Sequence, residues 1–154
     1  MYNDVNYEVS EKGIALLTLN RPQSMNSFSL NLIREVIDVC GKVNADDAVK
    51  ALVVTGSGKG FSSGGDITLL GAMDSTSNAK KTYDWSSAVV RAVYDVEKPV
   101  IAAINGAVAG AATALMMACD LIIASENAKF GFNFAGIAFC PDSGCSYFLV
   151  KKVG

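Results

Sequence analysis

The sequence has no histidine, and it has only three prolines and one tryptophan among its 154 residues. Without histidine, a serine has no ordinary base to activate it and a metal site has no imidazole ligand. The four cysteines, Cys40, Cys119, Cys140 and Cys145, form no C-x-x-C pair. We therefore expect buried free thiols and no metal centre.

Charge is also sparse. Charged residues make up 18% of the chain, the formal net charge is −2, and there is no polybasic or acidic run. These features argue against a nucleic-acid partner. The first residues, Met1 to Val5, lack the basic and apolar regions of a signal peptide, so the sequence predicts a cytoplasmic protein.

A membrane span is the main alternative for the apolar stretch Val100–Ala118, which is long enough to cross a bilayer. Much of it is Ala and Gly, the turn signal Asn105-Gly106 interrupts it, and neither flank carries a basic cluster. We therefore expect no membrane helix. With 51% hydrophobic residues and no linker or repeat, the sequence predicts one globular domain over residues 1–154.

The first part of the chain is predicted to form strands and then a helix. The β run Ile14–Leu19 ends before Pro22, which cannot continue a ladder, and Tyr7 and Val9 are expected to pair ahead of it. A helix follows with Ser29 as its N-cap. The apolar positions of this helix share one predicted face: Leu30, Ile33, Val36, Ile37, Cys40 and Val43.

The next strand, Ala51–Thr55, is apolar enough to be buried on both faces, and its link to the first strand predicts a right-handed parallel crossover. Asp66 is placed to cap a short helix that runs through Leu70, and a longer helix is expected over residues 79–96. Asp120–Ala124 is another predicted strand. The repeated order of strand and helix predicts an α/β fold that binds ligands where strands end.

The segment Lys98–Asp120 lies at the centre of this pattern. We interpret Val100–Ile104 as a strand, Asn105-Gly106 as a turn, and the Ala-rich residues that follow as a helix. Gly and Ala at the start of this helix leave its backbone uncovered. Its free N–H groups and positive dipole end would therefore face a bound anion or carbonyl.

Two glycine-rich motifs point to enzymes that other residues exclude. Gly56–Gly60 follows a strand like a phosphate loop, but Gly60 stands where Ser or Thr should hold magnesium and the glycine spacing is wrong. Gly60–Gly64 matches a nucleophile elbow, but the chain has no histidine to activate the serine. What remains is a Gly-rich loop at one strand end and a Gly-Ala helix start at the next.

Four segments resemble the crotonase (enoyl-CoA hydratase/isomerase) superfamily, in the order and at the spacing of that family. They are Leu19–Pro22 with Met25-Asn26, Phe61–Ile67, Lys98–Gly106 and Cys119–Leu121. The resemblance implies an α/β fold of repeated ββα units arranged as a spiral. It also implies an acyl-CoA substrate, with coenzyme A as part of that substrate and no separate cofactor.

By the same resemblance, the thioester carbonyl would lie between the N–H groups of Gly65 and Ala111, which would form an oxyanion hole. Such donors stabilise the enolate that forms when a thioester loses its α-proton. The alternative is that these small residues merely permit tight turns. Coenzyme A is expected to contact Arg21, Met25, Ser62, Ser63, Gly64, Asp66, Ile67 and Gly110.

The chain departs from the hydratase pattern, because Ala114 and Phe134 stand where hydratases carry two glutamates. Hydration is therefore disfavoured. The segment Pro141–Gly144 resembles enoyl-CoA isomerases, including ring isomerases of phenylacetate catabolism, and their acidic base falls at Asp142. Apolar neighbours should raise the pKa of Asp142 towards the range useful for proton transfer. The alternative is that Asp142 is the N-cap of a helix over Ser143–Val150.

An enoyl-CoA isomerase is the leading interpretation, and two alternatives stay open. A crotonase-like decarboxylase would form its enolate without a base, and an acyl-CoA-binding module would need no chemistry. Crotonase chains usually continue beyond the equivalent of Gly154 in helices that cover the acyl pocket and build a trimer. We therefore expect a truncated chain, or one completed by partner chains, and a homotrimer or dimer of trimers at full length. Part of the acyl pocket wall is expected from the loop Gly71–Asn78.

Overall fold

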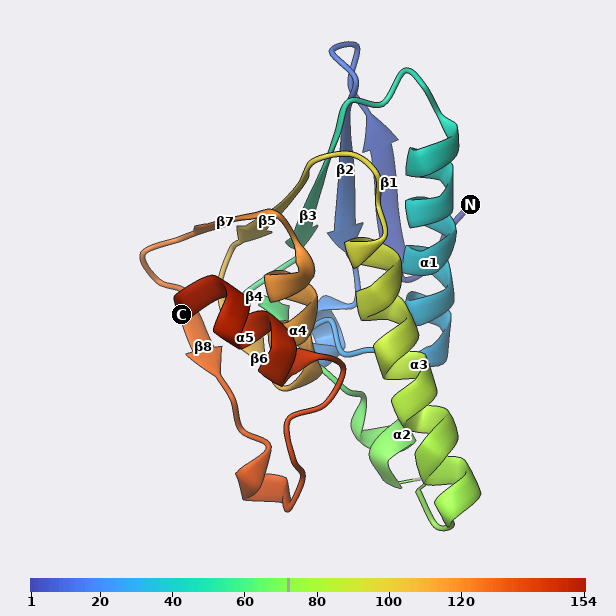
Figure 1. Cartoon of the computed structure of the whole chain (residues 1–154). Helices are drawn as coiled ribbons and strands as arrows, with labels where there is room; N and C mark the ends of the chain where they lie inside the picture. Colours follow the sequence, from blue (N-terminus) through green and yellow to red (C-terminus); the bar gives the residue numbers. More distant parts are fainter. Residues whose placement is uncertain (72) are drawn as a thin grey trace.

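The strands form two sheets, and the chain passes repeatedly from one to the other (Figure 1). The computed structural model describes residues 1–71 and 73–154. The larger sheet has the order β1-β2-β3-β5-β7, and the smaller sheet has the order β4-β6-β8. The strands are β1 Val5–Val9, β2 Ile14–Leu19, β3 Ala51–Gly56, β4 Gly60–Ser62, β5 Val100–Ile104, β6 Ala107–Ala109, β7 Leu121–Ala124 and β8 Lys129–Gly131.

Neighbouring strands in both sheets are parallel, except that β1 and β2 are antiparallel. The pairs β3/β4, β5/β6 and β7/β8 each send their first strand to the larger sheet and their second to the smaller one. Helices follow each pair along the chain. This arrangement confirms the predicted α/β fold of ββα units and the parallel pairing of β2 with β3.

The centre of the chain contains a strand that the sequence interpretation missed. The residues after the Asn105-Gly106 turn first form β6, and helix α4 (Ala111–Ala118) begins only afterwards. β6 finds ladder partners in β4 and β8, which are distant in sequence. Gly106 lets the turn before β6 pack against the backbone of Lys59, because a Cβ at this position would overlap the Lys59 carbonyl oxygen.

Helix α1 (Leu30–Ala45) begins where predicted, and the side chain of its N-cap Ser29 accepts a hydrogen bond from the Leu32 N–H. The predicted face was partly wrong, because Ile37 is 37% exposed and Leu30 is only half-buried. Both lie at the edge of the apolar stripe. The buried apolar residues of this helix are Leu32, Ile33, Val36, Val39, Cys40 and Val43.

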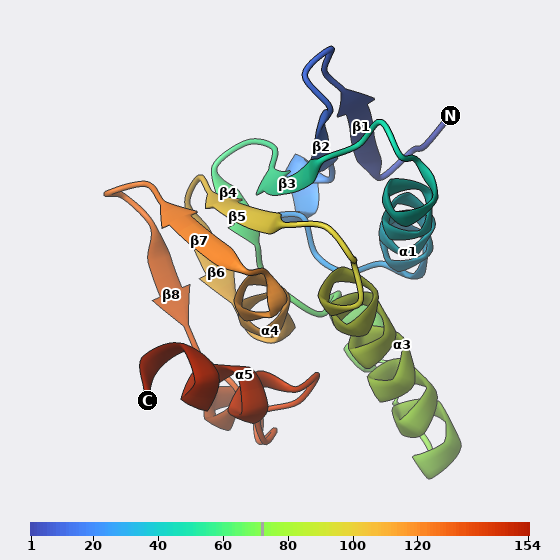
Figure 2. The ribbon, with the colours of Figure 1, turned by 45° about the horizontal axis from the view of Figure 1, so that its top comes forward.

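Helices α2 (Ile67–Gly71) and α3 (Thr76–Tyr94) follow β4. Asp66 caps the start of α2 as predicted, since its Oδ1 accepts from the Thr68 N–H at 3.0 Å. The long helix starts three residues earlier than predicted. Its first turn is polar, and Ser75 caps it by accepting from the Asn78 N–H. Helices α1 and α3 lie side by side (Figures 1 and 2).

Helix α4 is the buried centre of the fold, and all eight of its residues are buried. Helix α5 (Cys145–Val153) packs against it (Figure 2). The Nζ of Lys152 donates to the carbonyl oxygens of Cys119 and Asp120, just beyond the end of α4. The prediction that Ala51–Thr55 is buried on both faces is half right: Leu52 and Val54 are fully buried, and the intervening residues are partly exposed.

The apolar stretch Val100–Ala118 is divided among β5, β6 and α4. Among the described residues, no helix combines the length and the hydropathy that a membrane crossing requires. All four cysteines have free thiols, but Cys140 is exposed, contrary to the expectation that all would be buried. Burial raises the pKa of the Cys40 thiol to about 12.

Candidate active site

One pocket brings together the three residues that the sequence suggested as catalytic. It has a volume of about 180 Å³, and Gly65, Ala111 and Asp142 all line it. The loop after β4 supplies the first, the start of α4 the second, and the segment before α5 the third. Aromatic side chains form much of the remaining wall: Phe28, Tyr83, Phe134 and Phe139.

The N–H of Gly65 is held in a defined direction. The Phe28 N–H donates to the Gly64 carbonyl oxygen at 2.7 Å, within a parallel bridge between Phe28 and Gly65. The Gly64 carbonyl and the Gly65 N–H belong to one planar trans peptide group and point in opposite directions. The Gly65 N–H therefore points away from Phe28, and it donates to no atom of the described chain.

The second donor is at the N-terminus of α4. Ala111 is the first residue of this helix, so its N–H has no acceptor within the helix. It makes no other hydrogen bond within the described residues. The N-cap is Gly110, which has no side chain to cover the helix end and adopts φ 54° and ψ −134°. The positive end of the helix dipole adds to the attraction for a partly negative oxygen.

Glycine at position 64 lets the two donor segments touch. Gly64 has φ +85°, and a Cβ there would lie 2.6 Å from the Ala109 carbonyl oxygen and 2.9 Å from the Ala111 nitrogen. A real Cβ does not approach backbone this closely. These glycines do permit tight turns, and the same turns place two free N–H groups beside one pocket.

Asp142 is the single carboxylate among the described residues that line the pocket. Its Oδ1 is buried and has no hydrogen-bond partner within the described chain. Desolvation by burial raises the pKa of this carboxyl, and hydrogen bonds from the Ser143 side chain and the local backbone partly oppose the rise. Such a group is suited to exchanging protons with a bound molecule.

The alternative role of Asp142 as a helix cap is wrong. Helix α5 begins at Cys145, its N-cap is Gly144, and no side chain caps it. The hydrogen bond from the Cys145 N–H goes to the backbone carbonyl of Asp142, at 2.7 Å. The carboxylate therefore remains free of the helix end.

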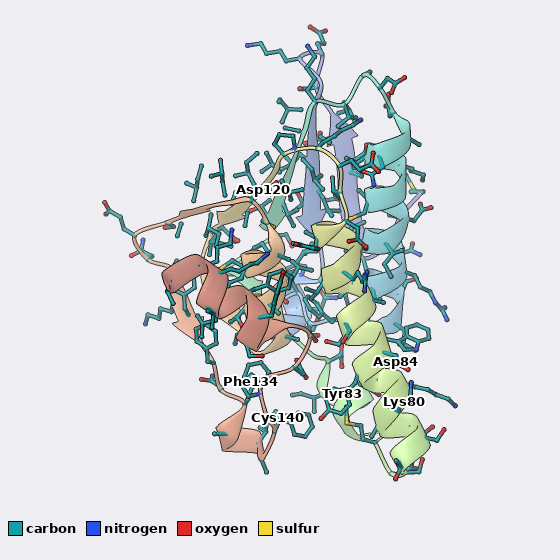
Figure 3. The ribbon with its side chains drawn as sticks, in the orientation of Figure 1. Lys80, Tyr83, Asp84, Asp120, Phe134 and Cys140 are labelled. Carbon is teal, nitrogen blue, oxygen red and sulfur yellow. The ribbon has the colours of Figure 1, made fainter. Side chains whose placement is uncertain are left out.

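Helix α3 contributes three pocket residues that the sequence interpretation missed: Thr82, Tyr83 and Ser86. Figure 3 shows Tyr83 on α3, facing the segment that carries Phe134 and Cys140. The pKa of Tyr83 is raised, first by desolvation and then by the charges of Asp142 and Cys140. The Ser86 hydroxyl lies 2.8 Å from that of Ser143. The spacing of Thr82, Tyr83 and Ser86 puts them on one face of α3, but nothing in the local sequence shows that this face meets the pocket.

The two positions that match the hydratase glutamates differ in their surroundings. Ala114 is fully buried within α4 and lies outside the set of described residues that line the pocket. Phe134 lines the pocket and is 4% exposed. Met73 confirms that the loop after α2 contributes to the wall, whereas Ala72 of that predicted segment lies outside the described residues.

Two charged residues predicted to bind coenzyme A are paired with each other. The Arg21 Nη1 lies 2.9 Å from the Asp66 Oδ2, and the Arg21 Nε lies 3.6 Å from a carboxylate oxygen of Asp4. Hydrogen bonds from the Thr68 side chain, from Arg21 and from Ser27 hold the pKa of Asp66 well below its usual range, despite desolvation. Coenzyme A binding by Arg21 and Asp66 stays a prediction.

The other predicted contacts divide into an exposed rim and a packed interior. Ile67 is 83% exposed and Met25 is 37% exposed, and Ser63 is exposed at the edge of the pocket. Ser62 is 0% exposed, so neither its side chain nor its backbone is open to a ligand, contrary to the predicted contact with coenzyme A. Gly110 lines the pocket. Within the described residues no cluster of His, Cys, Asp or Glu side chains fits a metal ion.

The chain matches known proteins over nearly its whole length. Residues 9–154 match the family model described as enoyl-CoA hydratase/isomerase. A crotonyl-CoA hydratase of Syntrophomonas wolfei is 38% identical over 99% of this chain, and a 1,2-epoxyphenylacetyl-CoA isomerase of Escherichia coli is 34% identical over 94% of it. The crystal structure of an enoyl-CoA hydratase from Bacillus anthracis superposes with a TM-score of 0.93 at 28% identity and 99% coverage.

The same matches cover less of the other proteins. The chain spans 58% of the Syntrophomonas relative, 56% of the Escherichia relative and 59% of the Bacillus structure. The two sequence relatives are named for different reactions. The choice between these reactions therefore has to be argued from the pocket of this chain.

Proposed function

Because the chain belongs to the enoyl-CoA hydratase/isomerase (crotonase) family, we propose that it acts on an acyl-CoA thioester. The thioester oxygen accepts hydrogen bonds from the N–H groups of Gly65 and Ala111. The observation that carries this proposal is that both N–H groups are unpaired within the described chain and belong to residues that line the same pocket as Asp142. Each preorganised donor of this kind is worth about 2.7–4 kcal/mol in the transition state.

The proposed reaction is the movement of a carbon–carbon double bond in an enoyl-CoA. The Asp142 carboxylate takes a proton from the α- or γ-carbon, and the electron pair of the broken C–H bond moves into a dienolate. Gly65 and Ala111 hold the dienolate oxygen. The protonated Asp142 then returns the proton at the other end of the conjugated system. One carboxyl group serves both steps, so no other proton carrier is needed.

Isomerisation is favoured over hydration because the described pocket residues include no carboxylate besides Asp142. Addition of water needs a group that orients and activates it, and the two positions matched to hydratase glutamates hold Ala114 and Phe134. Neither side chain can accept or donate a proton. A proton removed by Asp142 therefore returns to carbon, and no hydroxyl group is added.

The experiment is to incubate the protein with a β,γ-unsaturated acyl-CoA in deuterated buffer. We expect absorbance of the conjugated thioester to appear, with deuterium at the exchanging carbon and no hydroxyacyl product. Hydroxyacyl-CoA as the main product would contradict the isomerase assignment. A decarboxylase or a binding module would bind thioesters without exchanging α-protons, and that result would replace the proposal.

A homotrimer, or a dimer of trimers, at full length and a cytoplasmic location are further parts of the proposal. Strands β7 and β8 support association, because Leu121, Ile123 and Phe130 are 60%, 65% and 48% exposed. Apolar side chains gathered on a surface mark a region that another polypeptide covers. Light scattering of the purified protein tests this, and a mass equal to that of one chain at micromolar concentration would argue against it.

A further inference from the structure

The loop that carries Gly65 is fastened by a buried asparagine on another segment. Asn26 is 0% exposed and adopts φ +53°. Its Nδ2 donates to the carbonyl oxygens of Ser57, Gly60 and Phe61, at 2.9, 3.0 and 3.0 Å. Its Oδ1 accepts from the Arg21 N–H at 2.8 Å. One side chain therefore satisfies backbone groups along the whole approach to the Gly65 loop.

A buried serine extends this connection to the peptide group beside Gly65. Ser62 is also 0% exposed. Its hydroxyl donates to the Asn26 carbonyl oxygen at 2.7 Å and accepts from the Gly64 N–H at 3.1 Å. The carbonyl of the same Gly64 accepts from Phe28, which sets the direction of the Gly65 N–H. Both polar groups of Gly64 are thus fixed.

The residue on the other side of Gly65 is fixed as well. The Asp66 Oδ2 accepts from the Ser27 hydroxyl at 2.9 Å and from the Arg21 Nη1 at 2.9 Å. Ser27 directly follows Asn26, so one short segment holds both neighbours of Gly65. A hydrogen-bond donor held this way needs no reorientation when charge develops on the substrate oxygen.

We propose that Asn26 and Ser62 are positioning residues that hold the Gly65 N–H in its orientation toward the thioester oxygen. The inference rests on the proposed function of this N–H. Neither side chain lines the pocket, and both are fully buried. They act through Gly64 and the loop backbone and do not touch the substrate.

A purely structural role makes a different prediction. If Asn26 and Ser62 only stabilised the fold, replacing Ser62 would lower the free energy of unfolding without weakening the hydrogen bond from Gly65 to the thioester carbonyl. If they position the donor, the same replacement frees the Gly64 N–H and lets the Ser63–Gly64 peptide group rotate. Gly64 then shifts, the neighbouring Gly65 N–H shifts with it, and the thioester carbonyl loses part of a hydrogen bond. Misplacing a reacting group by about 1 Å costs on the order of a hundredfold in rate.

The test compares Ser62→Ala with a matched control, Thr55→Val. Thr55 on β3 donates its hydroxyl to the Ala103 carbonyl oxygen at 2.8 Å, so the control also removes one hydroxyl-to-backbone bond, but one that joins β3 to β5 and does not hold Gly64. Asn26→Gly is a second variant, because glycine accepts the positive φ of this position. Ser62→Ala carries the test if Asn26→Gly fails to fold.

The first readout is the infrared band of butyryl-CoA labelled with ¹³C at the thioester carbonyl. Hydrogen bonds to a carbonyl lower its stretching frequency, so the bound thioester should absorb below the free one. We expect Ser62→Ala to reduce this downshift and Thr55→Val to retain it. In the isomerisation assay, we expect kcat to fall about tenfold to a hundredfold for Ser62→Ala, with KM within about twofold.

The outcomes separate the two proposals. No downshift in the unaltered protein would overturn the oxyanion hole, and the positioning inference with it. A normal downshift that Ser62→Ala keeps in full would overturn the positioning inference alone. So would an equal loss of kcat in Thr55→Val, because the effect would then follow general stability.

Discussion

Replacement of Asp142 by Asn tests whether this carboxylate is the general base of the proposed isomerisation. Asn has nearly the same shape as Asp but cannot take up a proton near neutral pH. General bases contribute about 10²- to 10⁴-fold to rates. We therefore expect Asp142→Asn to lower the isomerisation rate at least a hundredfold while leaving the affinity for saturated acyl-CoA unchanged.

The stability of the same variant follows from the direction of the pKa shift. Burial raises the pKa of Asp142 above 3.8, so the folded state holds this proton more tightly than the unfolded state does. Protonation of Asp142 therefore stabilises the fold. This contribution is fully present below the pKa of Asp142 in the unfolded state and is lost as the pH rises through its pKa in the folded state. At pH 7 wild-type Asp142 thus bears a desolvation cost that Asn lacks. Asp142→Asn should therefore unfold no more readily than wild type at pH 7.

Steady-state kinetics and urea unfolding at pH 4 and pH 7 provide the assay. In the unaltered protein, kcat/KM should fall as the pH drops through the raised pKa, because only the carboxylate accepts a proton. The Asn variant should lack that pH dependence in its residual rate. Normal turnover by Asp142→Asn would refute the base assignment, and a large loss of stability at pH 7 would refute the reasoning from desolvation.

Three further changes test the oxyanion hole, a helix cap and the exposed sheet. Gly65→Pro removes one oxyanion donor and should lower kcat/KM about 10²- to 10³-fold by steady-state kinetics with the circular dichroism spectrum preserved; an unchanged rate would contradict the assignment. Ser29→Ala removes the N-cap of α1 and should cost about 1 kcal/mol in urea unfolding, so a loss below about 0.3 kcal/mol would argue against this cap. The 154-residue chain should bind a hydrophobic dye through β7 and β8, and Ile123→Lys should weaken that fluorescence; equal fluorescence in both proteins would place the dye elsewhere.

The sequence predicted those parts of the fold that depend on local pattern. The strand Ile14–Leu19, the N-cap Ser29 and the parallel pairing with the predicted strand Ala51–Thr55 follow from the apolar β run, capping chemistry and the strand–helix–strand order. Strands β4, β6 and β8 were missed because each has only three residues. Such short segments become strands only when distant neighbours supply their ladder bonds.

The candidate site likewise combines residues that could be predicted from the sequence with residues that depend on distant parts of the chain. Gly65, Ala111 and Asp142 could be placed from the resemblance, and the structure lines one pocket with them. Tyr83 could not be placed, because only packing shows which face of α3 meets the pocket. The role of Asn26 was also hidden, since its partners lie more than thirty residues further along the chain. Long-range contacts of this kind have no signal in local composition.

Under the proposed function, backbone groups and side chains divide the work of the site. The two donors belong to the backbone, and both depend on glycine. The Gly65 loop and the start of α4 meet without room for a Cβ at position 64, and Gly110 adopts a positive φ of 54°. Side chains then select the reaction. Ordered water needs polar partners, and Phe134 offers an apolar ring where a second carboxylate would have held water. With Asp142 as the single carboxylate of the described pocket, the dienolate regains its proton at the other end of the conjugated system, which is isomerisation.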